Sequence, residues 1–255
     1  MIGVIDSGVG GLSVLREIHA LLPERSLHYI GDTAWCPYGN KSFEEIIERC
    51  SLLVDHLISL GSELIVLACN SATIAAIESL RTRYPVPFIG MEPGVKPAAR
   101  LTQSNIIGVL ATEASLRGDR FHHLVSTHAS DLRVITRPCP RFVDLVEGGS
   151  LDGDEVDLAI RDYALPMVEA GADVLILGCS HYPFLKPALS RILPEHVQFI
   201  DTGGAIAKRV QDSNPSPDEH PKVTVQTTGS PDRFQKLLPL LAPELGVDCS
   251  KLVLP

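Results

Sequence analysis

The sequence predicts an α/β protein of two similar lobes, each built on a parallel sheet. Strand-like and helix-like segments alternate along most of the chain, which is typical of parallel sheets. One stretch also occurs twice, since residues 63–73 read ELIVLACNSAT and residues 173–183 read DVLILGCSHYP. Apolar runs of this kind, bounded by turn-prone residues, are typical of buried parallel strands.

The first half of the chain alternates regularly. We expect strands over 2–6, 27–31, the first cysteine stretch and 86–90, with helices over about 12–22, 42–60 and from the cysteine stretch to about 83. Ser42 and Glu45 have capping-box spacing, which indicates where the second helix begins. The glycine-rich turn 7–11 lacks a Walker lysine and a G-x-G-x-x-G pattern, so we expect its amides to approach an anion at a helix N-terminus.

The second half repeats this order. We expect strands over 106–111, 132–136, the second cysteine stretch and 197–200, a helix after the loop 112–115, a short element that carries Glu147, a helix over 152–170, and another that ends near 193. Gly3 matches Gly108 and Phe88 matches Phe199 at nearly the same spacing as the two cysteine stretches. A repeat of such long period indicates two similar lobes.

The remaining residues are too few for a further domain. We expect a helix from about 205, a surface linker over 213–221, a strand over 222–228, a helix over 231–241 and a strand over 251–254. This tail is expected to return to the first lobe. The predicted division is therefore 1–92 plus 207–255 for the lobe that carries Cys69, and 93–206 for the lobe that carries Cys179.

Composition excludes several functional classes. The 255 residues carry a formal net charge of −9, which leaves no basic surplus for binding a nucleic-acid backbone. No apolar stretch approaches the roughly 18 residues that a membrane helix needs, and no targeting segment precedes the first strand, so we expect a soluble, cytoplasmic protein. The six cysteines contain no C-x-x-C pair, so we expect free thiols.

Cys69 and Cys179 are the strongest functional candidates. Each is expected at the carboxyl end of a strand, where ligands bind in open α/β sheets. Asn70, Ser71 and Ser180 can cap the helices that follow, whose dipoles favour a thiolate. The alternative is that both are small core residues, but equivalent positions in two halves favour function. Opposed thiols suit inversion of a stereocentre, because one removes a proton from one face while the other delivers a proton to the opposite face.

Each thiol needs a neighbour that manages its proton. Asp6, at the end of the first strand, could serve Cys69, and His181 could serve Cys179. Read alone, Asp32 and Glu147 are solvated or capping residues, and several others are ordinary loop polars, namely Thr33, Cys36, Tyr38, Thr112 and Ser115. Zinc is disfavoured because the C-x-H spacing of Cys179 and His181 is not a recognised ligand motif, so we expect no metal. A cysteine hydrolase using Cys179 and His181 is the more serious alternative, although it gives Cys69 no role.

The motifs together resemble the bacterial glutamate racemase family. The matching segments are IGVIDSGVGGLSVLREI (2–18), GDTAWCPYGNKS (31–42), LACNSAT (67–73), GMEPGVKPA (90–98), CPRFVDLVEGG (139–149) and GCSHYP (178–183). The resemblance implies a cofactor-independent 1,1-proton transfer that interconverts L- and D-glutamate. The D-glutamate would supply peptidoglycan precursors, and hence cell-wall biogenesis and cell shape.

The resemblance also implies that the active site lies in the cleft between the two pseudo-symmetric lobes, and it implies roles for individual residues. Cys69 and Cys179 would be the two acid/bases, the first for D-glutamate and the second for L-glutamate, assisted by Asp6 and His181. Asp32 and Glu147 would lie in the pocket wall or behind it, with Thr112 and Ser115 at the pocket. The implied substrate contacts are Asp6, Ser7, Tyr38, Gly39, Asn70, Ser71, Ser180 and His181.

Some positions depart from the family pattern. Ser71 and Ser180 stand where threonine is usual, Trp35 where arginine is common, and Thr112-Glu113-Ala114-Ser115 replaces a T-x-G-T loop. Two alternatives stay open within the resemblance. The chain could be a related racemase for aspartate or a hydantoin, and some glutamate racemases bind and inhibit DNA gyrase, which this sequence does not reveal. The resemblance further implies a homodimer.

Overall fold

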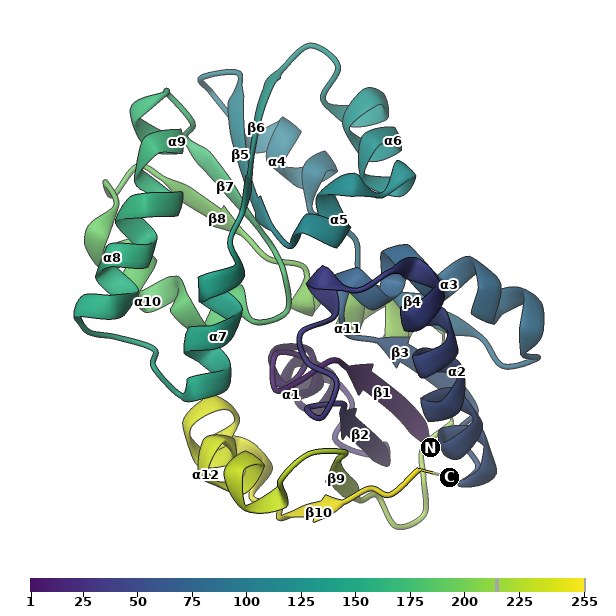
Figure 1. The fold of residues 1–255 in the computed structure, drawn as a ribbon. Coiled ribbons are helices and arrows are strands. Elements are labelled where there is room, and N and C mark those ends of the chain that lie inside the picture. The colour runs from purple at the N-terminus through teal and green to yellow at the C-terminus, as the bar shows by residue number, and fades with distance from the viewer. Residues whose placement is uncertain (214–215, 255) are drawn as a thin grey trace.

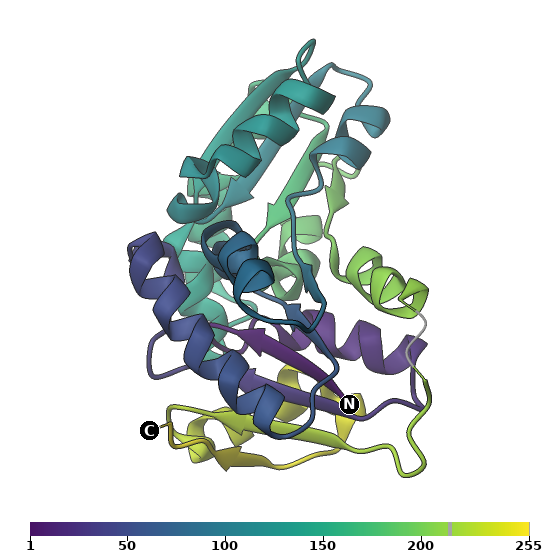
Figure 2. The same ribbon diagram turned by 90° about the vertical axis from the view of Figure 1, so that its right-hand side faces the viewer.

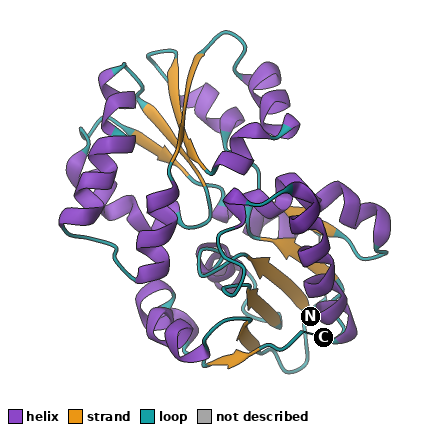
Figure 3. Ribbon diagram, in the orientation of Figure 1, coloured by secondary structure: helices purple, strands orange, loops and turns teal. Residues whose placement is uncertain are grey.

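The computed structural model describes residues 1–213 and 216–254 and has two α/β lobes, each with its own parallel sheet (Figure 1). The N-terminus and the C-terminal strand over residues 249–251 lie on the lobe that contains β1 (Ile2–Asp6) (Figures 1 and 2). Helices flank both sheets (Figure 3). The strands over residues 2–6, 64–67 and 174–178 are buried along their whole length, which accounts for their largely apolar sequences. The predicted fold class is confirmed.

The first sheet has six strands in the order β10-β9-β2-β1-β3-β4, and all its neighbours are parallel. Its strands are β1 (Ile2–Asp6), β2 (Leu27–Gly31), β3 (Leu64–Leu67), β4 (Phe88–Gly90), β9 (Val223–Thr227) and β10 (Cys249–Lys251). β1 lies at the centre, with Ile2 paired to Leu27 on one side and to Leu64 on the other. The C-terminal strands β9 and β10 extend this sheet beyond β2.

The second sheet has four parallel strands in the order β6-β5-β7-β8. Its strands are β5 (Ile106–Ala111), β6 (Arg133–Pro138), β7 (Val174–Gly178) and β8 (Gln198–Ile200). This order repeats the β2-β1-β3-β4 part of the first sheet, so β5 corresponds to β1 and β7 to β3. The internal repeat that the sequence predicts is therefore a repeat of topology.

Helices connect the strands. Those between strands of the first sheet or next to it are α1 (Leu12–Leu21), η1 (Tyr38–Asn40), α2 (Phe43–Ser59), α3 (Asn70–Arg83), α11 (Gly203–Asp212), α12 (Pro231–Leu241) and η3 (Pro243–Leu245). Those of the second lobe are α4 (Val95–Leu101), α5 (Glu113–Arg117), α6 (Asp119–His128), α7 (Pro140–Gly148), α8 (Asp154–Tyr163), α9 (Leu165–Glu169), η2 (Tyr182–Leu185) and α10 (Lys186–Ile192). The predicted capping box at Ser42 and Glu45 is present at the start of α2.

A few predicted elements differ from those observed. The helix expected over 152–170 is two helices, because Pro166 stands at the start of α9 and cannot continue a preceding helix. The last strand is Cys249–Lys251 and not 251–254. Part of the linker expected over 213–221, residues 214–215, lies outside the described residues. Within residues 1–213 and 216–254, no helix combines the length and apolar character that a membrane crossing requires.

Candidate active site

The two repeated cysteines occupy equivalent places in the two sheets. Cys69 follows β3 after one intervening residue, and Cys179 follows β7 directly. Both are buried, with 5% and 6% of their surface exposed. Each stands at the carboxyl end of a strand next to the central β1 or β5. Hydrogen bonds join the segments next to each cysteine to the other lobe, between Ser180 and Asp6 and between Ser71 and Thr112, so the two thiols lie at one interface.

Cys69 is itself the N-cap of α3. The amide of Ala72 donates to its Sγ over 3.4 Å, and the thiol donates to Ser7 Oγ over 3.7 Å. The prediction that Asn70 and Ser71 cap this helix is wrong, because β3 ends early enough for both to lie inside α3. Burial, reinforced by the charges of Asp6 and Cys179, raises the pKa of the Cys69 thiol to about 12. The helix dipole therefore does not make Cys69 a thiolate, and the thiol keeps its proton.

Asp6 connects the two lobes. It ends β1, is fully buried, and accepts the Gly8 amide at Oδ2 and the Ser180 hydroxyl at Oδ1, both over 2.9 Å. Burial raises the pKa of its carboxyl group, against the influence of His181. The Ser180 hydroxyl therefore makes a hydrogen bond from one lobe to the other. The prediction that Ser180 caps the following helix is wrong, because η2 begins after His181 without a side-chain cap.

His181 lies between a thiol and a carboxylate. Its Nδ1 is 3.6 Å from Cys179 Sγ, and its Nε2 is 2.7 Å from Glu147 Oε1, which also accepts the Val9 amide over 2.8 Å. Burial alone would lower the pKa of His181, but its hydrogen bonds with Cys179, Cys36 and Glu147 hold that pKa well above its usual range. Glu147 is therefore a direct partner of His181, a closer role than the pocket wall.

Cys36 is a neighbour that sequence reasoning missed. It lies in the loop after β2, and its sulfur, a Glu147 oxygen and a His181 ring nitrogen lie within 4.8 Å of one another. Burial raises the pKa of the Cys36 thiol to about 11. The three residues are far apart in sequence and come from both lobes, so no local motif could have joined them.

Four predicted pocket residues form a polar patch across the lobe interface. Ser71 Oγ lies 2.9 Å from Thr112 Oγ1, whose hydroxyl donates to Ser115 Oγ over 2.9 Å. The amide group of Asn70 is buried and has no hydrogen-bond partner among the described residues, at either Nδ2 or Oδ1. A buried side-chain amide without partners is costly. Asn70 is therefore ready to bind a polar ligand.

Tyr38 and Asp32 belong to a different cluster. The Tyr38 hydroxyl donates to Asp32 Oδ2 over 2.6 Å, Arg49 donates to both carboxylate oxygens over 2.8 and 2.7 Å, and Thr228 donates over 2.6 Å. The Tyr38 side chain is thus used inside the first lobe, and only its backbone and that of Gly39 remain for a ligand. Gly39 lies against Thr112, since a Cβ there would be 3.0 Å from the Thr112 Cβ. Sequence reasoning missed Arg49 and Thr228.

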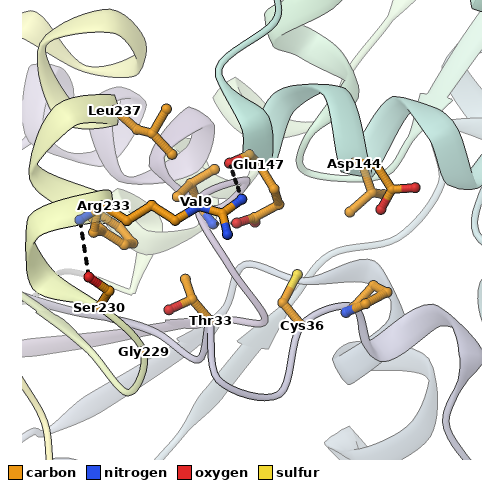
Figure 4. Close-up of a pocket in the computed structure, with 12 residues that line it drawn as sticks. Val9, Thr33, Cys36, Asp144, Glu147, Gly229, Ser230, Arg233 and Leu237 are labelled. Carbon is orange, nitrogen blue, oxygen red and sulfur yellow. Dashed lines mark hydrogen bonds between the residues drawn. The ribbon is translucent and has the colours of Figure 1, made fainter.

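A cavity of about 340 Å³ reaches the outer side of this site (Figure 4). It lies between α7, α12 and the loop after β2, and its lining includes Cys36, Asp144, Glu147 and Arg233. Arg233 donates to the Glu147 carbonyl oxygen over 3.1 Å. The cavity gives solvent a way to Glu147 and Cys36.

Comparisons with known proteins agree with this arrangement. The family model described as Asp/Glu/Hydantoin racemase matches residues 2–210. A glutamate racemase of Ectopseudomonas mendocina is 48% identical over 252 residues, covering 95% of each chain. The structure of Escherichia coli glutamate racemase with L-glutamate and the activator UDP-MurNAc-ala has a TM-score of 0.89 at 31% identity, covering 100% of this chain and 98% of that one. The Francisella tularensis enzyme with D-glutamate has a TM-score of 0.84 at 27% identity, covering 99% and 97%.

Proposed function

The chain belongs to the Asp/Glu/hydantoin racemase family, among the glutamate racemases, and we propose that it interconverts L- and D-glutamate by a two-base transfer of the Cα proton. Family membership makes it an isomerase. One observation carries the mechanism, which is the placement of Cys69 and Cys179 at equivalent strand ends of the two lobes, each with its own polar partners. Thiols supplied from two lobes can approach a bound substrate from opposite faces.

The proposed reaction moves two protons. With L-glutamate, Cys179 Sγ takes the proton from Cα, and the Cys69 thiol gives its own proton to the opposite face of the resulting carbanion. With D-glutamate the two sulfurs exchange roles. The raised pKa of Cys69 supports the L-to-D direction, because Cys69 then holds the proton that it donates to the carbanion. His181 Nδ1 faces the other sulfur and can exchange a proton with it.

We further propose that the polar groups at the lobe interface hold the substrate carboxylates and amine. Asn70, Ser71 and Thr112 offer an amide and hydroxyls there, and Ser7 and Ser180 flank Asp6. These contacts come from both lobes, so substrate would bind where the lobes meet. The division into 1–92 plus 207–255 and 93–206 then assigns one acid/base to each lobe.

The cellular role follows from the reaction. D-glutamate formed here would serve peptidoglycan synthesis, as the resemblance implies. All six cysteines are free thiols, which is usual for proteins of the reducing cytoplasm and supports that location. The homodimer and the independence from cofactors stay predictions.

The decisive experiment follows the Cα proton in deuterated water. Wild type should place solvent deuterium in the product enantiomer from either L- or D-glutamate. Cys69→Ala and Cys179→Ala should each lose racemisation, although a remaining thiol could still exchange the Cα proton of one enantiomer without inverting it. Cys249→Ser, which removes a half-buried thiol on β10, should behave as wild type.

Two outcomes would contradict the proposal. If wild type exchanges no deuterium with either enantiomer, glutamate is not the substrate, and aspartate is tested next. Normal turnover by Cys69→Ala would rule out the two-thiol mechanism and favour a hydrolase that uses Cys179 alone.

A further inference from the structure

Cys36, Glu147 and His181 bring three kinds of metal ligand to one point. They come from the loop after β2, from α7 and from the turn after β7, and their ligand atoms lie within 4.8 Å of one another. We propose that this cluster binds a thiophilic divalent cation of the zinc class, and that the bound ion inhibits the racemase reversibly. The ion would be an inhibitor and not a cofactor, so the expected metal-free reaction is unaffected.

Cysteine, histidine and glutamate are all residue types that bind zinc in proteins. Zn²⁺ binds cysteine sulfur at about 2.3 Å and histidine nitrogen or carboxylate oxygen at about 2.0–2.2 Å, in tetrahedral geometry. Ligand atoms of such a site are roughly 3.2–3.6 Å apart by that geometry. The 2.7 Å between His181 Nε2 and Glu147 Oε1 must therefore widen by roughly half an ångström or slightly more. Cys36 is only partly buried and lies in a loop, so its sulfur can adjust.

The cavity between α7, α12 and the loop after β2 gives an ion a route to the cluster and leaves space for water as a fourth ligand. Figure 4 shows the Cys36 sulfur and the Glu147 side chain facing the same space. Three protein ligands with one open position is the arrangement of zinc sites that also bind water. Asp144 adds negative charge to the lining, whereas the Arg233 guanidinium opposes a cation and is held by the Glu147 carbonyl oxygen.

Binding would interfere with the proposed acid–base chemistry at His181. An ion on Nε2 replaces the Glu147 contact and places its charge across the ring from Nδ1, the atom that faces Cys179. Binding also releases two protons to solvent, the thiol proton of Cys36 and the proton between His181 Nε2 and Glu147, because a metal-bound cysteine is a thiolate and a metal-bound ring nitrogen carries no proton. The inhibition rests on the proposed function, whereas binding does not.

The experiment measures zinc binding and zinc inhibition separately. The protein is first freed of metal with a chelator and reduced with a phosphine that binds zinc weakly. It is then titrated with Zn²⁺ in competition with a chromophoric chelator, which gives the affinity. A separate titration with Co²⁺ detects a thiolate-to-cobalt charge-transfer band. Racemisation is measured with and without Zn²⁺ for wild type, Cys36→Val and the matched control Cys249→Ser. Each variant is compared with its own zinc-free rate.

We expect one tight Zn²⁺ per chain in wild type and in Cys249→Ser, a cobalt–thiolate band, and inhibition that EDTA reverses. Cys36→Val should bind at least about 100-fold more weakly, because losing a ligand costs more than losing its outer partners, and should escape inhibition. If circular dichroism shows Cys36→Val unfolded, Cys36→Ser decides in its place.

Three results would overturn the inference. Equal zinc affinity in wild type and the Cys36 variant would mean that the ion binds elsewhere, such as at Cys179 with His181. No zinc binding by wild type would mean that the site does not exist. Binding without inhibition would overturn the inhibitory part. A zinc-free enzyme that does not racemise glutamate would count against the proposed function alone, since the binding measurements remain decisive.

Discussion

The Ser180 hydroxyl donates to Asp6 Oδ1 over 2.9 Å, although 174 positions separate the two residues. Ser180 follows Cys179, and Asp6 ends the central strand of the other lobe. This bond therefore couples the carboxylate that influences Cys69 to the loop that carries the second thiol. The spacing of the lobes at the two sulfurs depends in part on it.

We expect Ser180→Ala to lower kcat/KM about 10- to 100-fold, because a hydrogen bond to a charged group contributes about 1.5–3 kcal/mol. Ser180→Thr keeps the hydroxyl and should retain most of the activity. Racemisation followed by circular dichroism in both directions gives the rates, and thermal unfolding separates them from stability. A Ser180→Ala enzyme as active as wild type would show that the bond to Asp6 plays no part in catalysis.

Gly10 provides a second test of how closely the lobes approach. A Cβ at this position would overlap the His181 ring and the Ser180 hydroxyl. Gly10→Ala should therefore displace His181 and lower kcat at least about tenfold, as small misplacements of reacting groups do. Gly204→Ala in α11 is the matched control, because a Cβ there would meet only the end of the Glu17 side chain, in ordinary contact at 3.9 Å. It should keep full activity, with stability changed by at most about 1 kcal/mol. Equal activity of both variants would contradict a close-approach role for Gly10.

Much of the fold could be predicted from the sequence because its signals are local. Buried parallel strands are continuous apolar runs, and the capping box at Ser42 and Glu45 spans one helical turn. The break before Pro166 was missed, since one helix was expected over 152–170, although the proline is itself a local signal. Caps were less predictable. Whether Cys69 or Asn70 caps α3 depends on the residue at which β3 ends, and strand ends are set by pairing with neighbouring strands.

The site was predictable only where residues carry a recognisable motif. Cys69, Cys179 and His181 lie in the repeated stretches, whereas Arg49 lies outside every matching segment. Cys36 lies inside one of them but reads as an ordinary loop residue. Their partners are distant in sequence, and side-chain pairing across lobes or between a helix and a loop follows from the folded arrangement alone. Tyr38 illustrates the reverse case, because a residue in a matching motif uses its side chain inside the lobe.

Asp173 gives a prediction on stability and pH. Its carboxylate accepts hydrogen bonds from the Thr102 hydroxyl over 2.6 Å and from the amides of Gln103 and Ser104 over 2.7 and 2.9 Å. Although burial raises the pKa of Asp173, these bonds outweigh it and lower the pKa to about 2. A carboxyl group whose pKa is lower in the folded state stabilises the fold above its unfolded pKa of about 3.9, and this stabilisation is lost as pH falls through about 2.

We therefore expect Asp173→Asn to reduce the free energy of unfolding by about 1 kcal/mol at pH 7. This is less than the pKa difference between the folded and unfolded states would give, because solvent screens a carboxylate near the surface. The difference from wild type should shrink as pH falls from 4 towards 2. Urea unfolding at several pH values measures both. A difference that stays constant down to pH 2 would mean that the ionised carboxylate is not what stabilises this turn.

The buried pair of Asp32 and Arg49 gives the largest expected effect on stability. Asp32 is fully buried and Arg49 is 12% exposed, so Arg49→Met would leave a buried carboxylate without a counter-charge. We expect a loss of about 3–5 kcal/mol in the free energy of unfolding. The double variant Asp32→Asn with Arg49→Met should recover part of that loss, since it removes the charge as well. Arg141→Met, which breaks the exposed pair with Asp162, should cost about 1 kcal/mol or less. If Arg49→Met costs no more than Arg141→Met, the network around Asp32 does not hold the Tyr38 loop in place.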